Sequence, residues 1–222
     1  MSPEEFISSI INEYTIARKP KISNTKLSRG RSHSVSSVAE DLFAEYLINN
    51  DPEIESILID QPIFSQYGNV RFYPDITVIK NDKVVAFFDL KMDMGWKRDG
   101  LLELVGKHQK VIKTIKENIV TYKNGVTKEK QYIMISPSCT YNIVIISTRN
   151  SGIKLSEYLQ KSHTIFPSAG VYVLCNSKRY HPNSYGVEND YLIKNLEINN
   201  LEFKKIIINL RKPSNNPKTE VV

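Results

Sequence analysis

The chain has 222 residues, with 30 Lys and Arg against 24 Asp and Glu, which gives a formal net charge of +6. Its hydrophobic content of 41% and charged content of 24% are ordinary for a globular protein, so the composition excludes a disordered or low-complexity chain. The length suits one domain with a sizeable core. The basic excess favours a polyanionic partner such as nucleic acid, but only mildly.

The cysteines and histidines show no pattern of a metal or disulfide framework. Cys139 and Cys175 stand alone, which predicts two reduced thiols, and the four histidines lack zinc-ligand spacing. No apolar run approaches the roughly 18 residues of a membrane span, and the N-terminal stretch is acidic, unlike a signal sequence. We therefore expect a soluble cytoplasmic protein without a membrane segment.

The first 33 residues predict a helix followed by a basic loop. Ser2, Pro3 and two glutamates are typical of a helix start, and the helix is predicted over 3–17, packed on the body or, alternatively, at a dimer contact. Residues 18–33 hold six basic side chains and no acidic one. They form either a solvated linker or an arm whose Arg29 and Arg31 neutralise phosphates.

A second helix is predicted over 34–49, because its apolar residues recur at a helical period and its serines can cap it. Glu40 and Glu45 lie off the apolar stripe and are either solvated or free to reach a site. The stretch Ile57–Phe64, which contains Pro62, predicts an edge-like first strand.

The stretch Phe72–Lys91 is the most informative part of the chain. It predicts two apolar strands joined by a turn at Asn81-Asp82, with three charged residues at the strand ends. Side chains alternate along a strand, so Asp89 and Lys91 share a face. A two-residue turn places Asp75 diagonal to Asp89, and a three-residue turn places the two residues opposite each other.

Either register brings the two carboxylates within about 5–8 Å of each other. Carboxylates at that distance repel unless a cation lies between them, and Mg²⁺ prefers oxygen ligands of this kind. A lysine beside such an ion can orient a water or hold a phosphate oxygen. The spacing therefore predicts a cation site formed by Asp75, Asp89 and Lys91, and the alternative is three ordinary surface charges at solvated strand ends.

Pro74-Asp75, followed after thirteen residues by Asp89-Leu90-Lys91, resembles the motif of the PD-(D/E)xK nuclease superfamily. The resemblance covers about residues 34–147. It implies an α/β fold with a mixed central sheet flanked by helices, restriction-endonuclease-like, and hydrolysis of DNA phosphodiester bonds with Mg²⁺, for which Mn²⁺ can substitute. It implies a metal held by Asp75, Asp89 and the carbonyl of Leu90, with Glu40 as a further ligand and Glu45 as its fallback.

By the same resemblance, Lys91 would orient and help deprotonate the attacking water, and the protein would be a type II restriction enzyme or a related defence nuclease, working as a homodimer. Two alternatives stay open. One is a nuclease of this fold that acts on RNA or on particular DNA structures, and the other is a non-catalytic nucleic-acid-binding protein.

A glycine-containing loop follows Lys91 and carries Trp96, Lys97 and Arg98, which predicts either contacts to bases and phosphates or a tryptophan that covers the core edge. Asp93 would be a peripheral ligand if the strand continued. A lysine-bearing helix is predicted over 99–118. His108 lies in the middle of this helix, and no pattern in the sequence supports a role for it in proton transfer.

The C-terminal part predicts a strand, helix and strand in a parallel crossover, followed by a last helix and a tail. Leu201 is expected among the packed residues of the last helix. The predicted segments are 142–147, 153–160, 170–175 and 201–211, with a polar turn or hairpin over 122–131. The domain division is then residues 1–17, 18–33, 34–212 as the nuclease-like domain, and 213–222 as a disordered tail.

Overall fold

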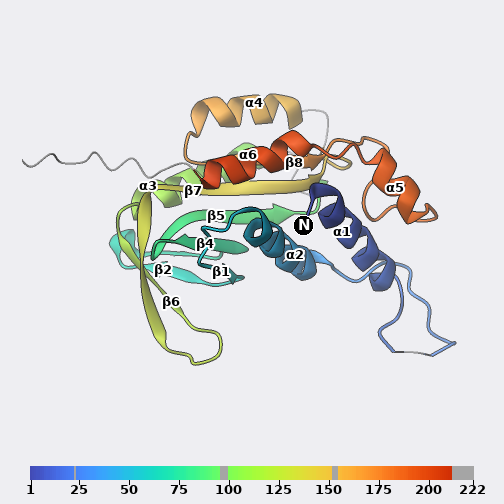
Figure 1. The fold of residues 1–222 in the computed structure, drawn as a ribbon, viewed down its shortest axis with the longest axis horizontal. Coiled ribbons are helices and arrows are strands. Elements are labelled where there is room, and N and C mark those ends of the chain that lie inside the picture. The colour runs from blue at the N-terminus through green and yellow to red at the C-terminus, as the bar shows by residue number, and fades with distance from the viewer. Residues whose placement is uncertain (23, 96–99, 152–154, 212–222) are drawn as a thin grey trace, which may run out of the picture.

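The computed structural model describes residues 1–22, 24–95, 100–151 and 155–211. Within these ranges the chain forms six α-helices and one mixed, open sheet of eight strands (Figure 1). The elements are α1 Pro3–Ala17, α2 Ser36–Asn50, β1 Ser56–Ile59, β2 Ile63–Ser65, β3 Val70–Phe72, β4 Ile76–Lys80, β5 Lys83–Lys91, α3 Leu101–Ile115, β6 Ile119–Lys123, β7 Lys130–Ser147, α4 Leu155–Ile165, β8 Val171–Cys175, α5 Asn189–Asn195 and α6 Asn200–Leu210.

The sheet is built around β5 and β7. The order of the strands is β1-β4-β5-β7-β6-β2-β3, and β8 pairs with the C-terminal part of β7. The β5–β7 and β7–β8 pairs are parallel and the other pairs are antiparallel, so the predicted mixed sheet and the predicted parallel crossover are confirmed. The strand expected over 142–147 is the last third of a much longer strand.

The helices cover both faces of the sheet. Phe88 and Leu90 of β5 pack in one cluster with α1, α2, α5 and α6, and the alternate residue Phe87 packs in another cluster with the C-terminal half of α3. A third cluster joins the start of α3 and α4 to β7 and β8. Since successive side chains of a strand point to opposite faces, α3 and α4 lie on the face to which Phe87, Asp89 and Lys91 belong. None of the described helices is long and apolar enough to cross a bilayer.

The β4–β5 hairpin combines features of both predicted registers. Asn81 and Asp82 form a two-residue turn with φ of 48° and 55°, and Lys80 pairs with Lys83. Asparagine and aspartate tolerate this left-handed conformation, which the right-handed twist of a hairpin requires. A bulge then shifts the register, so that Ile76 pairs with Phe88. Continued by one residue, the shifted register places Asp75 opposite Asp89.

The stretch Ile57–Phe64 forms two strands instead of the single strand predicted. β1 pairs with β4 at one edge of the sheet, while β2 pairs with β3 and β6 near the other edge. Asp60, with φ of 46°, and Pro62 lie between them. The backbone at Asp60 departs from a strand conformation, and proline has no N–H for a ladder hydrogen bond, so the two segments take different partners.

The C-terminal region differs from the predictions in two respects. It contains a short helix, α5, that was not predicted, and Leu201 is 60% exposed at the start of α6 instead of packed. The buried residues of α6 are Phe203, Ile206 and Leu210, which share one side of the helix by their spacing. The predicted disordered tail, 213–222, lies outside the described residues.

Candidate active site

Asp75, Asp89 and Lys91 lie together at one end of the β4–β5 hairpin. The Lys91 Nζ atom is 3.6 Å from Asp75 Oδ2 and 3.9 Å from Asp89 Oδ2. Asp75 precedes β4, and the other two residues end β5 on one face of the strand. The structure therefore brings the three predicted residues together, with the ammonium group close to both carboxylates.

Leu90 fixes the position of Asp75. Its backbone N–H donates a hydrogen bond of 2.6 Å to Asp75 Oδ2. In a strand, the N–H and C=O groups of one residue point to the same side, so the Leu90 carbonyl is directed toward the strand edge where Asp75 lies. This orientation makes the carbonyl oxygen a plausible third donor beside the two carboxylates.

Asp89 is held by two aromatic side chains from other elements. Tyr141 of β7 donates a hydrogen bond of 2.9 Å to Oδ1, and His108 Nε2 of α3 lies 3.1 Å from Oδ2. The two rings stack, with centroids 3.8 Å apart and planes within 3°. Tyr141 and His108 are both buried, so they hold the Asp89 carboxylate in one orientation.

These surroundings push the pKa values of the two aspartates in opposite directions. Burial raises the pKa of Asp75, and the charge of Asp89 adds to that effect, while Lys91 and the Leu90 amide oppose it without cancelling it. Burial alone would also raise the pKa of Asp89, but His108, Lys91 and Tyr141 hold it below its ordinary value. Asp89 thus stays ionised, and an added cation would favour the ionised form of Asp75.

Glu40 and Asp60 add negative charge beside Asp75. The pKa of Glu40 is raised to about 7, first by burial and then by the charges of Asp75 and Asp60, and Lys91 acts against this. The Asp60 backbone N–H donates to the Asp75 carbonyl at 2.8 Å, which fixes the end of β1 against the site. Among the described residues, this end of the sheet therefore places several carboxylates around the Lys91 ammonium.

The donor set fits a hard divalent cation with few protein ligands. Within the described ranges, no three His, Cys, Asp or Glu side chains group closely enough to hold a metal ion, so Glu40 does not complete a preformed cage. Mg²⁺ keeps several of its waters and is commonly held by one or two carboxylates. Asp75, Asp89 and the carbonyl of Leu90 supply oxygen donors of this kind, and burial together with neighbouring negative charge raises the pKa of both Asp75 and Glu40.

Asp93 does not belong to this site. β5 ends at Lys91, and the chain turns so that Asp93 accepts hydrogen bonds from Asn150 Nδ2 at 2.6 Å and from the Gly95 amide at 2.9 Å. His181 Nε2 is 3.5 Å away on its other side. The expectation of a peripheral ligand is wrong, because it required the strand to continue.

The structure does not show the residues that were predicted to contact nucleic acid beside Asp75, Asp89 and Lys91. Trp96, Lys97 and Arg98 lie outside the described residues. Arg29 and Arg31 are exposed on the loop between α1 and α2, which Figure 1 shows extending away from the sheet, and Arg29 Nε donates to the Arg31 carbonyl. Their contact with phosphates stays a prediction.

Two residues of the site were not assigned to it from the sequence. His108 lies between Val105 and Ile112 on the buried stripe of α3, and this spacing could have indicated that the histidine faces the sheet. Tyr141 pairs with Phe87 across β5 and β7, two positions before Asp89. That register depends on a bulge near Val85, which no local pattern in the sequence reveals.

The comparisons with known proteins leave the site to be interpreted from its geometry. No family model matches the chain, and no curated protein sequence matches it.

Proposed function

We propose that the protein is a Mg²⁺-dependent nuclease that hydrolyses phosphodiester bonds of DNA, with the restriction-endonuclease-like arrangement that the Pro74-Asp75 and Asp89-Leu90-Lys91 motif implies. The observation that carries the proposal is the approach of Asp75, Asp89 and Lys91, with Nζ within 4.0 Å of both carboxylates. The buried His108 and Tyr141 side chains hold the Asp89 carboxylate in one orientation, whereas a solvated surface charge is not held in this way.

In this proposal Asp75, Asp89 and the Leu90 carbonyl hold the ion. When bound there, Mg²⁺ supplies Lewis-acid polarisation of the phosphate and of a water. Lys91 donates to a phosphate oxygen or orients the attacking water and helps to deprotonate it. Hydrolysis places the water oxygen on phosphorus and breaks the bond to the 3′ oxygen, which takes up a proton and leaves a 5′-phosphate and a 3′-hydroxyl.

The direct test is cleavage of supercoiled plasmid DNA by the purified protein. We expect nicking or linearisation with Mg²⁺ and none with EDTA. The Asp75→Asn variant should cleave about a hundredfold more slowly or worse, because a lost cation ligand removes several kcal/mol of transition-state stabilisation. Asp82→Asn is the matched control, since Asp82 is an exposed acid in the turn of the same hairpin. Equal rates for the two variants would contradict the assignment of Asp75.

A second test concerns His108 as a positioning residue. His108→Leu removes the group that holds Asp89 Oδ2, and we expect it to weaken Mg²⁺ activation or the cleavage rate by about 10–100-fold. His108→Gln retains an N–H donor and should recover part of the loss. The Mg²⁺ concentration for half-maximal cleavage distinguishes positioning from a purely structural role, because simple destabilisation would lower the yield of active protein without changing that concentration.

A further inference from the structure

One face of the sheet extension formed by β3, β2, β6 and the start of β7 contributes no residue to the core clusters that the described helices join. Residues paired across strands share a face, and the pairs Phe64–Arg71, Phe64–Thr121, Thr121–Tyr132, Ile119–Met134 and Lys123–Lys130 follow one another across these strands. The opposite face is covered, since Ile63, Phe72, Val120 and Ile135 pack in the cluster under α3. We call the uncovered side the outer face.

The outer face combines exposed rings, apolar side chains and cations. Tyr132 is 66% exposed and Tyr73, which follows Arg71 by two positions, is 54% exposed. Each ring has a cation over it at 5.2 Å from the ring centroid, Arg71 over Tyr73 and Lys130 over Tyr132. Ile119 and Met134, which are paired with each other beside Thr121 and Tyr132, are also exposed, so apolar side chains lie next to positive charge.

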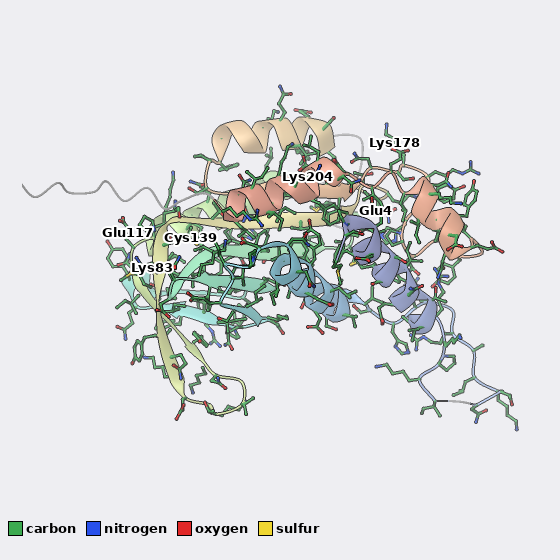
Figure 2. The ribbon with its side chains drawn as sticks, in the orientation of Figure 1. Glu4, Lys83, Glu117, Cys139, Lys178 and Lys204 are labelled. Atoms are coloured by element: carbon green, nitrogen blue, oxygen red, sulfur yellow. The ribbon has the colours of Figure 1, made fainter. Side chains whose placement is uncertain are left out.

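The charge of the outer face has one sign. The described strands β2, β3, β6 and β7 contain no Asp or Glu. Lys123 and Lys130 project at the hairpin end, and Lys83, which pairs with Met134, adds a cation at the start of β5. Figure 1 shows the β6–β7 hairpin extending away from the helices, and Figure 2 labels Lys83 near its base.

At Lys83 the outer face borders a hollow of about 900 Å³. Serine, threonine and asparagine side chains line the hollow, but so do the carboxylates of Glu53 and Glu202, and the Lys205 ammonium pairs with Glu202 at 2.6 Å. The positively charged surface therefore ends at the rim of the hollow.

We propose that the outer face binds single-stranded nucleic acid at a site separate from the catalytic one. Aromatic rings on a flat surface stack with unpaired bases, and nearby cations neutralise the phosphates. A duplex keeps its bases stacked inside and would leave the apolar side chains exposed. A second copy of the chain, related by a two-fold axis, would bring the same cations against each other, so charge complementarity favours nucleic acid.

The Lys83 end of the outer face is remote from Asp89 and Lys91, whereas Tyr73 lies two residues before Asp75. Lys83 and Lys91 are eight positions apart along β5, which corresponds to roughly 26 Å. Lys83 also lies on the opposite side of the sheet from Asp89, since it precedes the bulge and faces away from the α3 cluster. A strand bound over Lys83 and Tyr132 would therefore leave Asp89 and Lys91 free.

The test is fluorescence anisotropy in EDTA with a labelled oligothymidylate of about 12 nucleotides, within the site sizes of single-strand-binding surfaces. We expect Tyr132→Leu and Tyr73→Leu each to weaken binding about tenfold, as the loss of one stacked base does. Tyr132→Phe keeps the ring and should bind as the wild type does. Lys123→Gln should lower the slope of log affinity against log salt by about 0.7, the value for one phosphate contact on a single strand.

Controls separate this proposal from the nuclease proposal. Binding is measured in EDTA and is therefore scored whether or not the protein cleaves DNA with Mg²⁺, and Lys113→Gln, an exposed lysine of α3, should bind the oligonucleotide as tightly as wild type. An oligouridylate of the same length shows whether the site takes RNA, DNA or both, and binding of either supports the proposal. Thermal melting must show that the leucine variants are folded.

Three outcomes would overturn it. In the first, a duplex of equal length binds as tightly as the single strand. In the second, folded leucine variants bind the oligonucleotide with unchanged affinity. In the third, sedimentation shows that Tyr132→Leu dissociates an oligomer, which would make the outer face a contact between copies of the chain.

Discussion

Replacing Lys91 with alanine is expected to lower the rate of DNA cleavage by about 10²–10⁴-fold, the usual range for a group that assists proton transfer. The same change should leave Mg²⁺ binding intact or improve it. The Lys91 ammonium lies 3.6 Å and 3.9 Å from the two aspartate oxygens, and its removal leaves their charges uncompensated. A cation then gains more from binding between them.

The measurement is the cleavage rate as a function of Mg²⁺ concentration. A fall in the maximal rate, together with an equal or lower Mg²⁺ concentration for half-saturation, is the expected pattern. Lys113→Ala, an exposed lysine of α3, serves as the control for loss of one positive charge. Lys91→Arg keeps the charge but cannot readily give up a proton, so an active arginine variant would restrict Lys91 to an electrostatic role. An alanine variant as active as wild type would remove the central residue from the proposed mechanism.

The sequence was most informative where local chemistry decides the structure. α1 begins after Ser2, whose side chain and that of Glu5 form the reciprocal hydrogen bonds of a capping box. The Asn81-Asp82 turn and the two apolar strands beside it also depend on neighbouring residues alone. The approach of Asp75 to Asp89 was predictable for the same reason, because a hairpin brings residues near in sequence into register.

The missed features depend on contacts between distant segments. Asp89 is oriented by residues that follow it by 19 and 52 positions, and the second of these depends on the parallel register of β5 and β7. The separation of β1 from β2 is set by which strands they pair with, although Asp60 and Pro62 mark the break. α5 is short and has only Leu192 buried, so no apolar stripe identified it.

The motif of Asp75, Asp89 and Lys91 does not by itself show that the two aspartates differ in their surroundings. Asp75 and Asp89 are chemically equal in the sequence, but the structure gives them different surroundings and opposite pKa shifts. His108, Lys91 and Tyr141 keep Asp89 ionised, while burial and the charge of Asp89 raise the pKa of Asp75. Pairs of acids separated in this way are typical of sites where one group is fixed and the other responds to a ligand.

The other large effect is expected at the far end of β4, where Lys80 and Asp51 form a buried ion pair. Asp51 is fully buried and Lys80 is 4% exposed, and the Lys80 ammonium also donates to the Leu210 carbonyl at 3.0 Å. These contacts join the end of α2, the end of β4 and the end of α6. Lys80→Met should therefore lower the free energy of unfolding by about 3–5 kcal/mol, because it leaves the buried Asp51 carboxylate without the ammonium, and the half-exposed Arg211 and the Glu53 amide compensate it weakly.

Thermal or urea unfolding measures this effect, and Lys83→Met is the matched control. Lys83 pairs with Lys80 across the hairpin but is exposed, so its loss should change the free energy of unfolding by less than about 0.5 kcal/mol. The double variant Lys80→Met with Asp51→Leu should recover much of the loss, since removal of both charges leaves no unpaired ion in the core. Equal costs for the two lysine substitutions would show that the buried pair does not hold β4 in place, and the position of Asp75 would then depend on the bulge, the Leu90 amide and the Asp60 amide.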